Sequence, residues 1–256
     1  MKLLIKGYQK IRWVVMLFII LAFVFITYNT IIHQESLAMK IFIFIVAVIV
    51  IGVTLFYEYL KKKYTDLQKS LVTAHSIKET QALRDELVKL DKVNGMKDSI
   101  ALFDVLFSLD KNQPEETLRL LDQNDKFFRS NLDMILVRRF STFKAYTLIN
   151  NRTQTKKAVQ ELYKLKETNL NQSKKMSLLY NWDQIEAMNL GYAQNDPRKA
   201  LKVYQSMDTS KMNPRELLHL NVEIREMAHR IKDEGLITET NEVINSISID
   251  SPFRGN

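Results

Sequence analysis

The sequence predicts an all-α protein: two transmembrane helices that form a hairpin, followed by a cytoplasmic α-helical domain of about three helical hairpins. Three observations predict this class. Two apolar runs of membrane-spanning length lie near the start of the chain. The later chain has apolar residues at helical spacing and no stretch that alternates like a half-buried strand. Finally, Pro114, Pro197 and Pro214 each follow a polar residue, as Pro does at the first position of a helix.

The two apolar runs are residues 13–32 and 41–60. The first contains no charged residue, and the second contains only Glu58. Twenty helical residues rise about 30 Å, which is the thickness of the hydrocarbon core of a bilayer. Neither run has the polar stripe of a soluble amphipathic helix. Both are therefore expected to span the membrane, and the short segment 33–40 must connect them as a tight hairpin.

Positive charge predicts the orientation of this hairpin. Lys and Arg gather before the first run and at Lys61-Lys62-Lys63, whereas the connecting segment has Lys40 alone. Because cytoplasmic flanks collect positive charge, we expect a multi-pass protein of the cell membrane with both termini in the cytoplasm. Aromatic and basic residues near the helix ends are expected to anchor at the lipid headgroups. These anchors are Trp13, Tyr57, Tyr59, Lys61, Lys62 and Lys63.

A cleavable signal peptide is the alternative reading of the first run. Ser36-Leu37-Ala38 could be its small-x-small cleavage site. The apolar segment of such signals is roughly 7–15 residues long, shorter than residues 13–32, so the hairpin is preferred. In the alternative, the second run alone would anchor the chain.

Charge and cysteine content exclude two classes of function. The chain has a formal net charge of +8, but the eight Lys and Arg and two Glu of residues 1–63 account for +6 of it. The remaining chain, at +2, has no basic surplus of the kind that nucleic-acid binding requires. The absence of cysteine excludes disulfides and thiol chemistry.

Residues 64–94 are expected to form one continuous juxtamembrane helix. Leu67 and Leu71 belong to a seam with alternating spacings of three and four, whose phase shifts at Ile77. Such a seam can form a coiled coil that joins two copies of the chain, or it can pack on the domain that follows. Asn94-Gly95 is expected to end the helix.

Residues 95–256 are expected to form a helical-repeat domain. Helix starts are predicted near residues 96, 114, 131, 153, 173, 197, 214 and 238, and Gly235 is expected to close the helix that starts at Pro214. Thr117, Ala158 and Ala200 recur at sequence spacings of 41 and 42, and each lies near the start of a short helix that follows a longer apolar one. This arrangement indicates a repeated helical hairpin, because two helices approach closely only where side chains are small.

The second helix of the last unit resembles the tetratricopeptide repeat family. Ala200 and Tyr204 have the four-residue interval of that family's small and aromatic positions, and Ala187 matches the small position of the first helix. Tyr163 is the corresponding aromatic for Ala158, at an interval of five. The spacing of 41–42 departs from the family's period of about 34 residues. The resemblance implies a solenoid whose concave face holds a peptide or another protein; an irregular helical bundle is the alternative.

No reactive constellation is evident. Glu216-x-x-His219 and Glu226-x-x-His229 match the Glu-x-x-His pattern of di-iron bundles, but both would lie on one helix about 15 Å apart. His219, Glu223 and Glu226 are expected to face solvent. We therefore expect no metal, no cofactor and no catalytic site.

The expected function is protein–protein interaction: a scaffold or recruitment module that the hairpin anchors in the lipid bilayer, with partner proteins that the sequence does not identify. The alternative is an accessory or regulatory subunit of a membrane complex, whose transmembrane hairpin packs on partner helices. The two membrane helices lack internal charge, so a channel or transporter is not expected.

Overall fold

The computed structural model of the chain describes residues 2–168 and 180–254; of residues 2–14, 16 and 168 it describes the backbone alone. The chain divides into two compact units, Met1–Lys62 and Lys63–Asn256. The described residues contain helices and connecting turns and no β-strand, so the predicted all-α class is confirmed.

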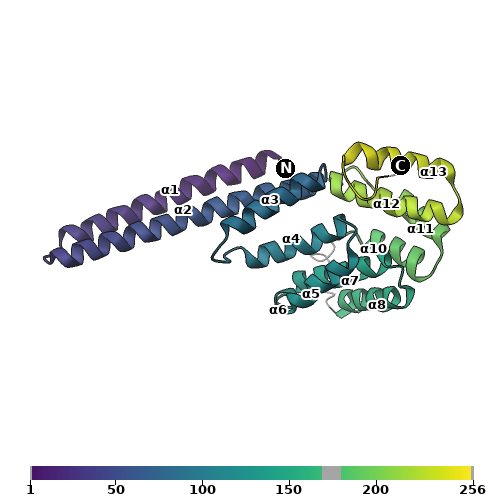
Figure 1. The fold of residues 1–256 in the computed structure, drawn as a ribbon, viewed down its shortest axis with the longest axis horizontal. Helices are drawn as coiled ribbons and strands as arrows, with labels where there is room; N and C mark the ends of the chain where they lie inside the picture. Colours follow the sequence, from purple (N-terminus) through teal and green to yellow (C-terminus); the bar gives the residue numbers. More distant parts are fainter. Residues whose placement is uncertain (1, 169–179, 255–256) are drawn as a thin grey trace. The chain divides into compact units, whose positions relative to one another are not determined.

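The first unit contains two long antiparallel helices (Figure 1). Helix α1 spans Lys2–Ile32, and α2 begins at Leu37 and ends at Thr73 in the second unit. Among the described residues, α2 is the one helix long and apolar enough to cross a membrane, whereas the apolar segment found in α1, Leu17–Ile32, is shorter. One candidate span is therefore present in the structure, and the second span stays a prediction.

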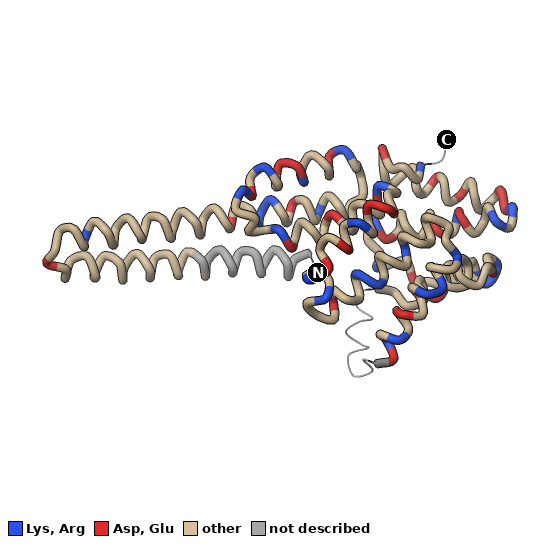
Figure 2. Tube along the Cα trace, turned by 60° about the horizontal axis from the view of Figure 1, so that its bottom comes forward, with Lys and Arg blue, Asp and Glu red and all other residues tan. Residues whose placement is uncertain are grey.

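Side chains of the first unit lie in an arrangement suited to lipid. Between Val15 and Tyr59 most large apolar side chains are exposed, among them Phe18 at 75% and Phe25 at 65%. Figure 2 shows long uncharged stretches along both helices of this unit. The hydroxyl groups of Thr30 and Thr54 donate to carbonyl oxygens one turn earlier in their own helices, at 2.9 and 2.8 Å. Such bonds satisfy polar groups without water.

The second unit consists of helical hairpins that follow one another along the chain. The pairs are α4 with α5, α7 with α8, α10 and η2 with α11, and α12 with α13. The end of α2 and α3 form a further hairpin, which is joined by the bonds of Ser70 to Thr80 and of Lys63 to Glu86. Each hairpin contacts the next, through α3 and α4, α5 and α7, α8 and η2, and α11 and α12. The bounds are α3 Ile77–Leu90, α4 Lys97–Asp110, α5 Pro114–Gln123, α6 Asp125–Phe128, α7 Leu132–Leu148, α8 Arg152–Thr168, α10 Trp182–Met188, η2 Asn189–Ala193, α11 Pro197–Gln205, α12 Pro214–Ile231 and α13 Glu234–Ile247.

Most predicted helix starts agree with these bounds. Pro114, Pro197 and Pro214 each stand in the first turn of a helix. Asn213 and Glu216 form a reciprocal capping box at the start of α12. The start expected near residue 173 lies outside the described residues, and the start expected near 238 is found about one turn earlier, at the N-terminus of α13.

The predicted continuous helix over residues 64–94 is wrong. Helix α2 ends at Thr73, Ala74 takes a left-handed conformation with φ 50°, and Ser76 caps α3. The chain reverses there, and α3 runs back along the end of α2. Ser70 bonds to Thr80 and Lys63 pairs with Glu86 across the two helices. The seam leucines Leu67, Leu71 and Leu87 are buried within the chain. The seam is therefore divided between α2 and α3, and of its two predicted alternatives the structure shows the packing within the chain.

One type of turn recurs in the hairpins and has almost no loop. The first helix ends in a left-handed residue, with φ of 53° at Asn112, 59° at Asn150 and 62° at Asn195. The amide of the next residue donates back to a carbonyl of the first helix. Gln113, for example, donates to the carbonyl of Ser108 at 2.9 Å, and Gln113 is also the N-cap of the second helix. This is the Schellman arrangement, with Asn in place of the more common Gly.

Glycine does not end the helices where it was expected. Lys232, with φ 60°, is the left-handed residue after α12, and Gly235 lies inside α13. Helix α3 ends at Leu90, before Asn94-Gly95, and Asn94 rather than Gly95 has a positive φ. The predicted glycine caps are therefore wrong.

The three small positions Thr117, Ala158 and Ala200 each lie in the second helix of a hairpin, and all three are buried. Thr240, in the second helix of the last hairpin, is buried in the same way. Thr117 bonds to Ser108 across its hairpin at 2.7 Å, so at this hairpin the small residues meet where the helices cross.

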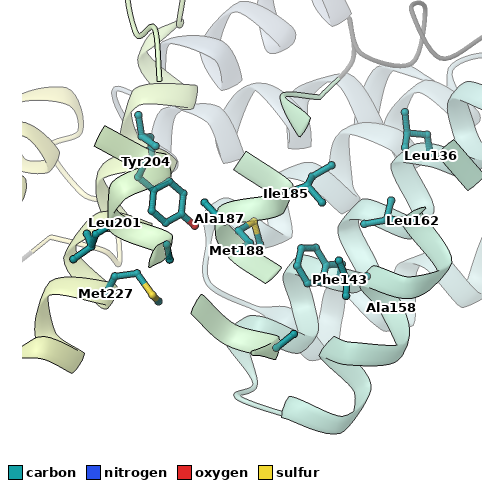
Figure 3. Close-up of a cluster of buried hydrophobic side chains, with 14 residues drawn as sticks. Leu136, Phe143, Ala158, Leu162, Ile185, Ala187, Met188, Leu201, Tyr204 and Met227 are labelled. Carbon is teal, nitrogen blue, oxygen red and sulfur yellow. The ribbon is translucent and has the colours of Figure 1, made fainter. Parts of the chain in front are cut away.

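Large residues four positions after the small ones fill the space between hairpins. They are Leu121, Leu162, Tyr204 and Ile244, each no more than 2% exposed. In the hairpin of α7 and α8 the residue four positions after Ala158 is Leu162, because residues four apart share a helix face. Tyr163, which was predicted for this role, is partly buried and packs against the same core cluster. Figure 3 shows the main core cluster, in which Leu162 of α8 and Tyr204 of α11 join side chains of α7, α10 and α12.

Candidate functional site: a buried charge network and an adjoining groove

Helix α12 carries three charged or polar side chains at intervals of four: Arg215, His219 and Glu223. His219 is 9% exposed and Glu223 is 1% exposed. The prediction that they face solvent is therefore wrong; Glu226 is partly buried. The physical reason is that α12 is covered on two faces. Its apolar face packs in the core clusters with α11 and α13, and its polar stripe contacts α4 and α7.

Asp110, the last residue of α4, is the first anion of this stripe. Its carboxylate accepts two bonds from the guanidinium of Arg215, both at 2.7 Å, and a third contact at 2.7 Å from His219 Nε2. Burial raises the pKa of Asp110, but the charge of Arg215 and the hydrogen bonds from Arg215 and His219 outweigh it and lower the pKa below its usual value. The carboxylate is therefore ionised and ties α4 to α12.

His219 is held as a neutral ring. Burial lowers its pKa, against the opposing charge of Asp110. Its Nε2 faces Asp110, while its Nδ1 is buried without a hydrogen-bond partner among the described residues. The ring also packs edge-on against Phe253, with centroids 6.0 Å apart.

Lys144 of α7 and Glu223 of α12 form the second buried pair. Their side chains are 5% and 1% exposed. Tyr192 of η2 donates its hydroxyl to the other carboxylate oxygen of Glu223 at 2.5 Å. Burial lowers the pKa of Lys144, and the nearby positive charge of Arg215 acts in the same direction. Through these contacts one helix, α12, is bound to α4, α7 and η2 at once.

Beside the network lies a groove made of two adjoining cavities. One, of about 290 Å³, is lined by Asn112, Tyr192, Glu223 and Arg225 among others. The second, of about 470 Å³, extends to Asn195 and Pro197. Asn150, Glu226 and Arg230 line both cavities, so the two adjoin each other. We call the two adjoining cavities together the polar groove.

Two arginines of α12 line the polar groove and differ in their partners. Arg230 pairs with Glu226 at 3.1 Å, donates to the carbonyl of Gly191 and lies 4.8 Å from the ring centroid of Tyr192. Among the described residues, Arg225 donates to two neutral oxygens, Asn241 Oδ1 and the carbonyl of Phe253, both at 2.7 Å. Burial lowers the pKa of Arg225, and the charge of Glu226, which acts from beyond ion-pair distance, opposes this only in part.

Apart from Trp13, the predicted membrane anchors lie near the point in the sequence where the two units meet. Tyr57 and Tyr59 are exposed at 40% and 44%, and Lys61 lies 4.6 Å from the centroid of the Tyr57 ring. Lys62 is exposed, while Lys63 pairs with Glu86 of α3 at 2.6 Å. The side chain of Trp13 lies outside the described residues.

The predicted repeat residues do not line the polar groove. Thr117, Ala158, Ala187, Ala200 and Tyr204 are buried between helices. Tyr163 is partly buried, and its hydroxyl donates to Glu186. These residues shape the scaffold that carries the groove.

The residues that build the network and the groove were missed from the sequence, although a signal was present. Arg215, His219 and Glu223 recur every four residues on one helix face, which is the spacing of a second packed stripe. Lys144 stands inside the apolar run of α7, where a solvated lysine is out of place. In the part of the chain that the structure describes, no group of three or more His, Asp or Glu side chains could hold a metal ion.

Comparison with known proteins adds no relative. No protein-family model, curated protein or solved structure matches this chain.

Proposed function

We propose that this protein is a membrane-anchored protein–protein interaction module, in which an apolar helical hairpin holds a stack of helical hairpins at the cytoplasmic face of the cell membrane. The observation that supports the proposal is that exposed apolar side chains are concentrated in the first unit and are few in the second. Among the described residues, the exposed large apolar side chains lie between Val15 and Tyr59, apart from Val72, Val88, Val93 and Ile249.

The first unit supports the anchor. Exposed apolar side chains on this scale would be unfavourable in water, and a bilayer removes that cost. Residues 13–32 and 41–60 are proposed as the two spans, with basic residues at both outer ends on the cytoplasmic side. The internally bonded hydroxyls of Thr30 and Thr54 favour contact with lipid over polar packing on partner helices.

The second unit supports the interaction. Successive helical hairpins that contact their neighbours are the architecture of repeat proteins, which commonly bind other proteins. The polar groove provides a hollow lined by amide, guanidinium and carboxylate groups. The tetratricopeptide resemblance points to the same role. Helix α12 contacts α4 and α7, so their faces toward α12 are not open to a partner. The polar groove is therefore the surface that we propose for the partner.

Two measurements test the topology. A reporter fused after Asn256 should be cytoplasmic, and one inserted at Glu35 should be external. External labelling at Asn256, or cytoplasmic labelling at Glu35, would contradict the anchored hairpin.

Photo-cross-linking in cells tests the interaction. A cross-linking side chain at Asn195, which lines the polar groove, should capture the same protein partner repeatedly. The same side chain at exposed Lys202 of α11, which does not line the groove, should not. Capture through Phe44 of α2, with none through Asn195, would favour the alternative function, a subunit whose membrane helices pack on partner helices.

A further inference from the structure

The hairpin turns place three asparagine side chains along the polar groove. Asn112, Asn150 and Asn195 end the first helices of three successive hairpins, and the left-handed turn sets the same backbone conformation at each. All three residues are exposed. Asn112 and Asn150 line one cavity, and Asn150 and Asn195 line the other. Each amide offers one acceptor and two donors, which matches the C=O and N–H groups of a peptide backbone.

The charge in the polar groove is incompletely paired. Glu223 pairs with Lys144, and Glu226 pairs with Arg230, so both carboxylates of the groove already have a cation. Arg225 is partly buried and has only neutral acceptors among the described residues. A guanidinium in this position can form charge-assisted hydrogen bonds to an anion. The polar groove therefore offers one guanidinium, that of Arg225, without an ion-pair partner among the described residues.

From these two observations we propose that the polar groove binds an extended peptide segment, whose backbone bonds to the asparagine side chains and whose carboxylate pairs with Arg225. This inference rests on the proposed interaction function and names the class of partner segment. The carboxylate belongs to an Asp or Glu side chain or to a peptide C-terminus, and both have the same chemistry toward a guanidinium.

A binding assay with the full chain in detergent micelles tests the proposal. The probes are labelled hexapeptides: amidated hexaglutamate, hexaserine with a free C-terminus, amidated hexaserine and amidated hexalysine. Binding of hexaglutamate would show that the groove recognises side-chain carboxylates. Binding of hexaserine with a free C-terminus would show that it recognises a C-terminal carboxylate. The two amidated peptides without a carboxylate should bind at least about tenfold more weakly, because a charge-assisted bond is missing. Preference for hexalysine, or equal binding of all four peptides, overturns the proposal.

Variants locate the binding. Arg225→Gln should weaken binding of the carboxylate peptide about tenfold or more, whereas Arg198→Gln, at an exposed position of α11 outside the groove, should leave it unchanged. Asn150→Gly removes the amide shared by both cavities and keeps a residue suited to the left-handed turn; it should weaken binding severalfold. The matched control is Asn94→Gly, whose residue has φ 56° and does not line the groove.

The outcomes separate this inference from the proposed function. If Arg225→Gln perturbs folding, Asn150→Gly still decides the matter, because it leaves the Arg225 contacts in place. Equal peptide binding by wild type, Arg225→Gln and Asn150→Gly overturns the peptide site. If cross-linking at Asn195 then still captures the partner, the interaction function stands and only the carboxylate recognition fails.

Discussion

Lys144 of α7 and Glu223 of α12 form an ion pair in the interior of the helical unit, with side chains 5% and 1% exposed. The pair joins two helices that are distant in the sequence and belong to different hairpins. Together with the bonds from Arg215 and His219 to Asp110, it adds buried ion pairs and hydrogen bonds to the contact of α12 with α4 and α7. An interior of this kind depends on complete pairing, because a single buried charge left without a partner is strongly destabilising.

Glu223→Gln should therefore destabilise the helical unit by about 3–5 kcal/mol, since it leaves the Lys144 ammonium without its carboxylate. Denaturant unfolding of the full chain in micelles, followed by circular dichroism, measures the loss. The exposed pair Glu116–Arg119 is the control, and Glu116→Gln should leave the free energy of unfolding nearly unchanged. A double variant, Lys144→Met with Glu223→Leu, should recover most of the stability, and failure to recover it would show that the charges do more than balance each other.

Acidification should weaken the unit through His219. Burial lowers the pKa of the folded ring below its usual 6.5, so the unfolded chain binds more protons as the pH falls through that value. The stability that the neutral ring contributes is present above pH 6.5 and is lost as the pH falls toward the folded pKa. Arg215 and Lys144 add to this effect, because both disfavour a further positive charge.

Unfolding curves at pH 7.5 and pH 5.5 measure this dependence. The wild type should lose stability between the two, and His219→Gln should lose less. His229→Gln, at an exposed position of the same helix, should respond to pH as the wild type does. If His219→Gln and the wild type respond equally, another group is responsible for the acid sensitivity.

Local signals predicted the helices well, because they depend on neighbours in the sequence. Pro197 preceded by Asp196 identifies a helix start, and Asp196 indeed accepts from the amide of Lys199. The break at Ala74 has a weaker signal, Ser76 followed three residues later by Glu79 as at a helix start, because neither Gly nor Pro stands there. The reversal is also stabilised by the C-terminal segment. Asp250, near the other end of the chain, accepts bonds from the amides of Ile77 and Lys78.

The burial of the charged face of α12 could not be predicted from local signals in the sequence. A helix with one apolar face and one charged face is normally half solvated, and this led to the prediction that His219 faces water. The burial of that face depends on Asp110 and Lys144, which α4 and α7 bring from distant parts of the sequence. The periodicity of a sequence predicts that a helix has a polar stripe. It does not predict which other helices cover that stripe.

Leu162 and Tyr163 allow a direct test of the repeat register. Leu162 is fully buried in the main core cluster, so Leu162→Ala should cost about 2–5 kcal/mol through lost burial and the cavity left behind. Tyr163→Phe removes only the hydroxyl bond to Glu186 and should cost about 0.5–1.5 kcal/mol. Unfolding curves of the two variants decide which residue fills the position; a larger effect at Tyr163 would restore the register first expected from the sequence.

Ala200 lies where three elements meet, and its size should be critical. It is fully buried, and a Cβ built on Gly191 would lie 3.3 Å from the Ala200 Cβ, so the second helix approaches the first closely. Ala200→Leu should overpack this crossing and cost about 1–3 kcal/mol, and Ala158→Leu, at 8% exposure, should fall in the same range. The controls lie on the same helices: Lys202→Leu and Gln160→Leu, at exposed positions, should change the free energy of unfolding by no more than about 0.5 kcal/mol. Equal effects in all four variants would mean that the small residues do not set the distance between the helices of each hairpin.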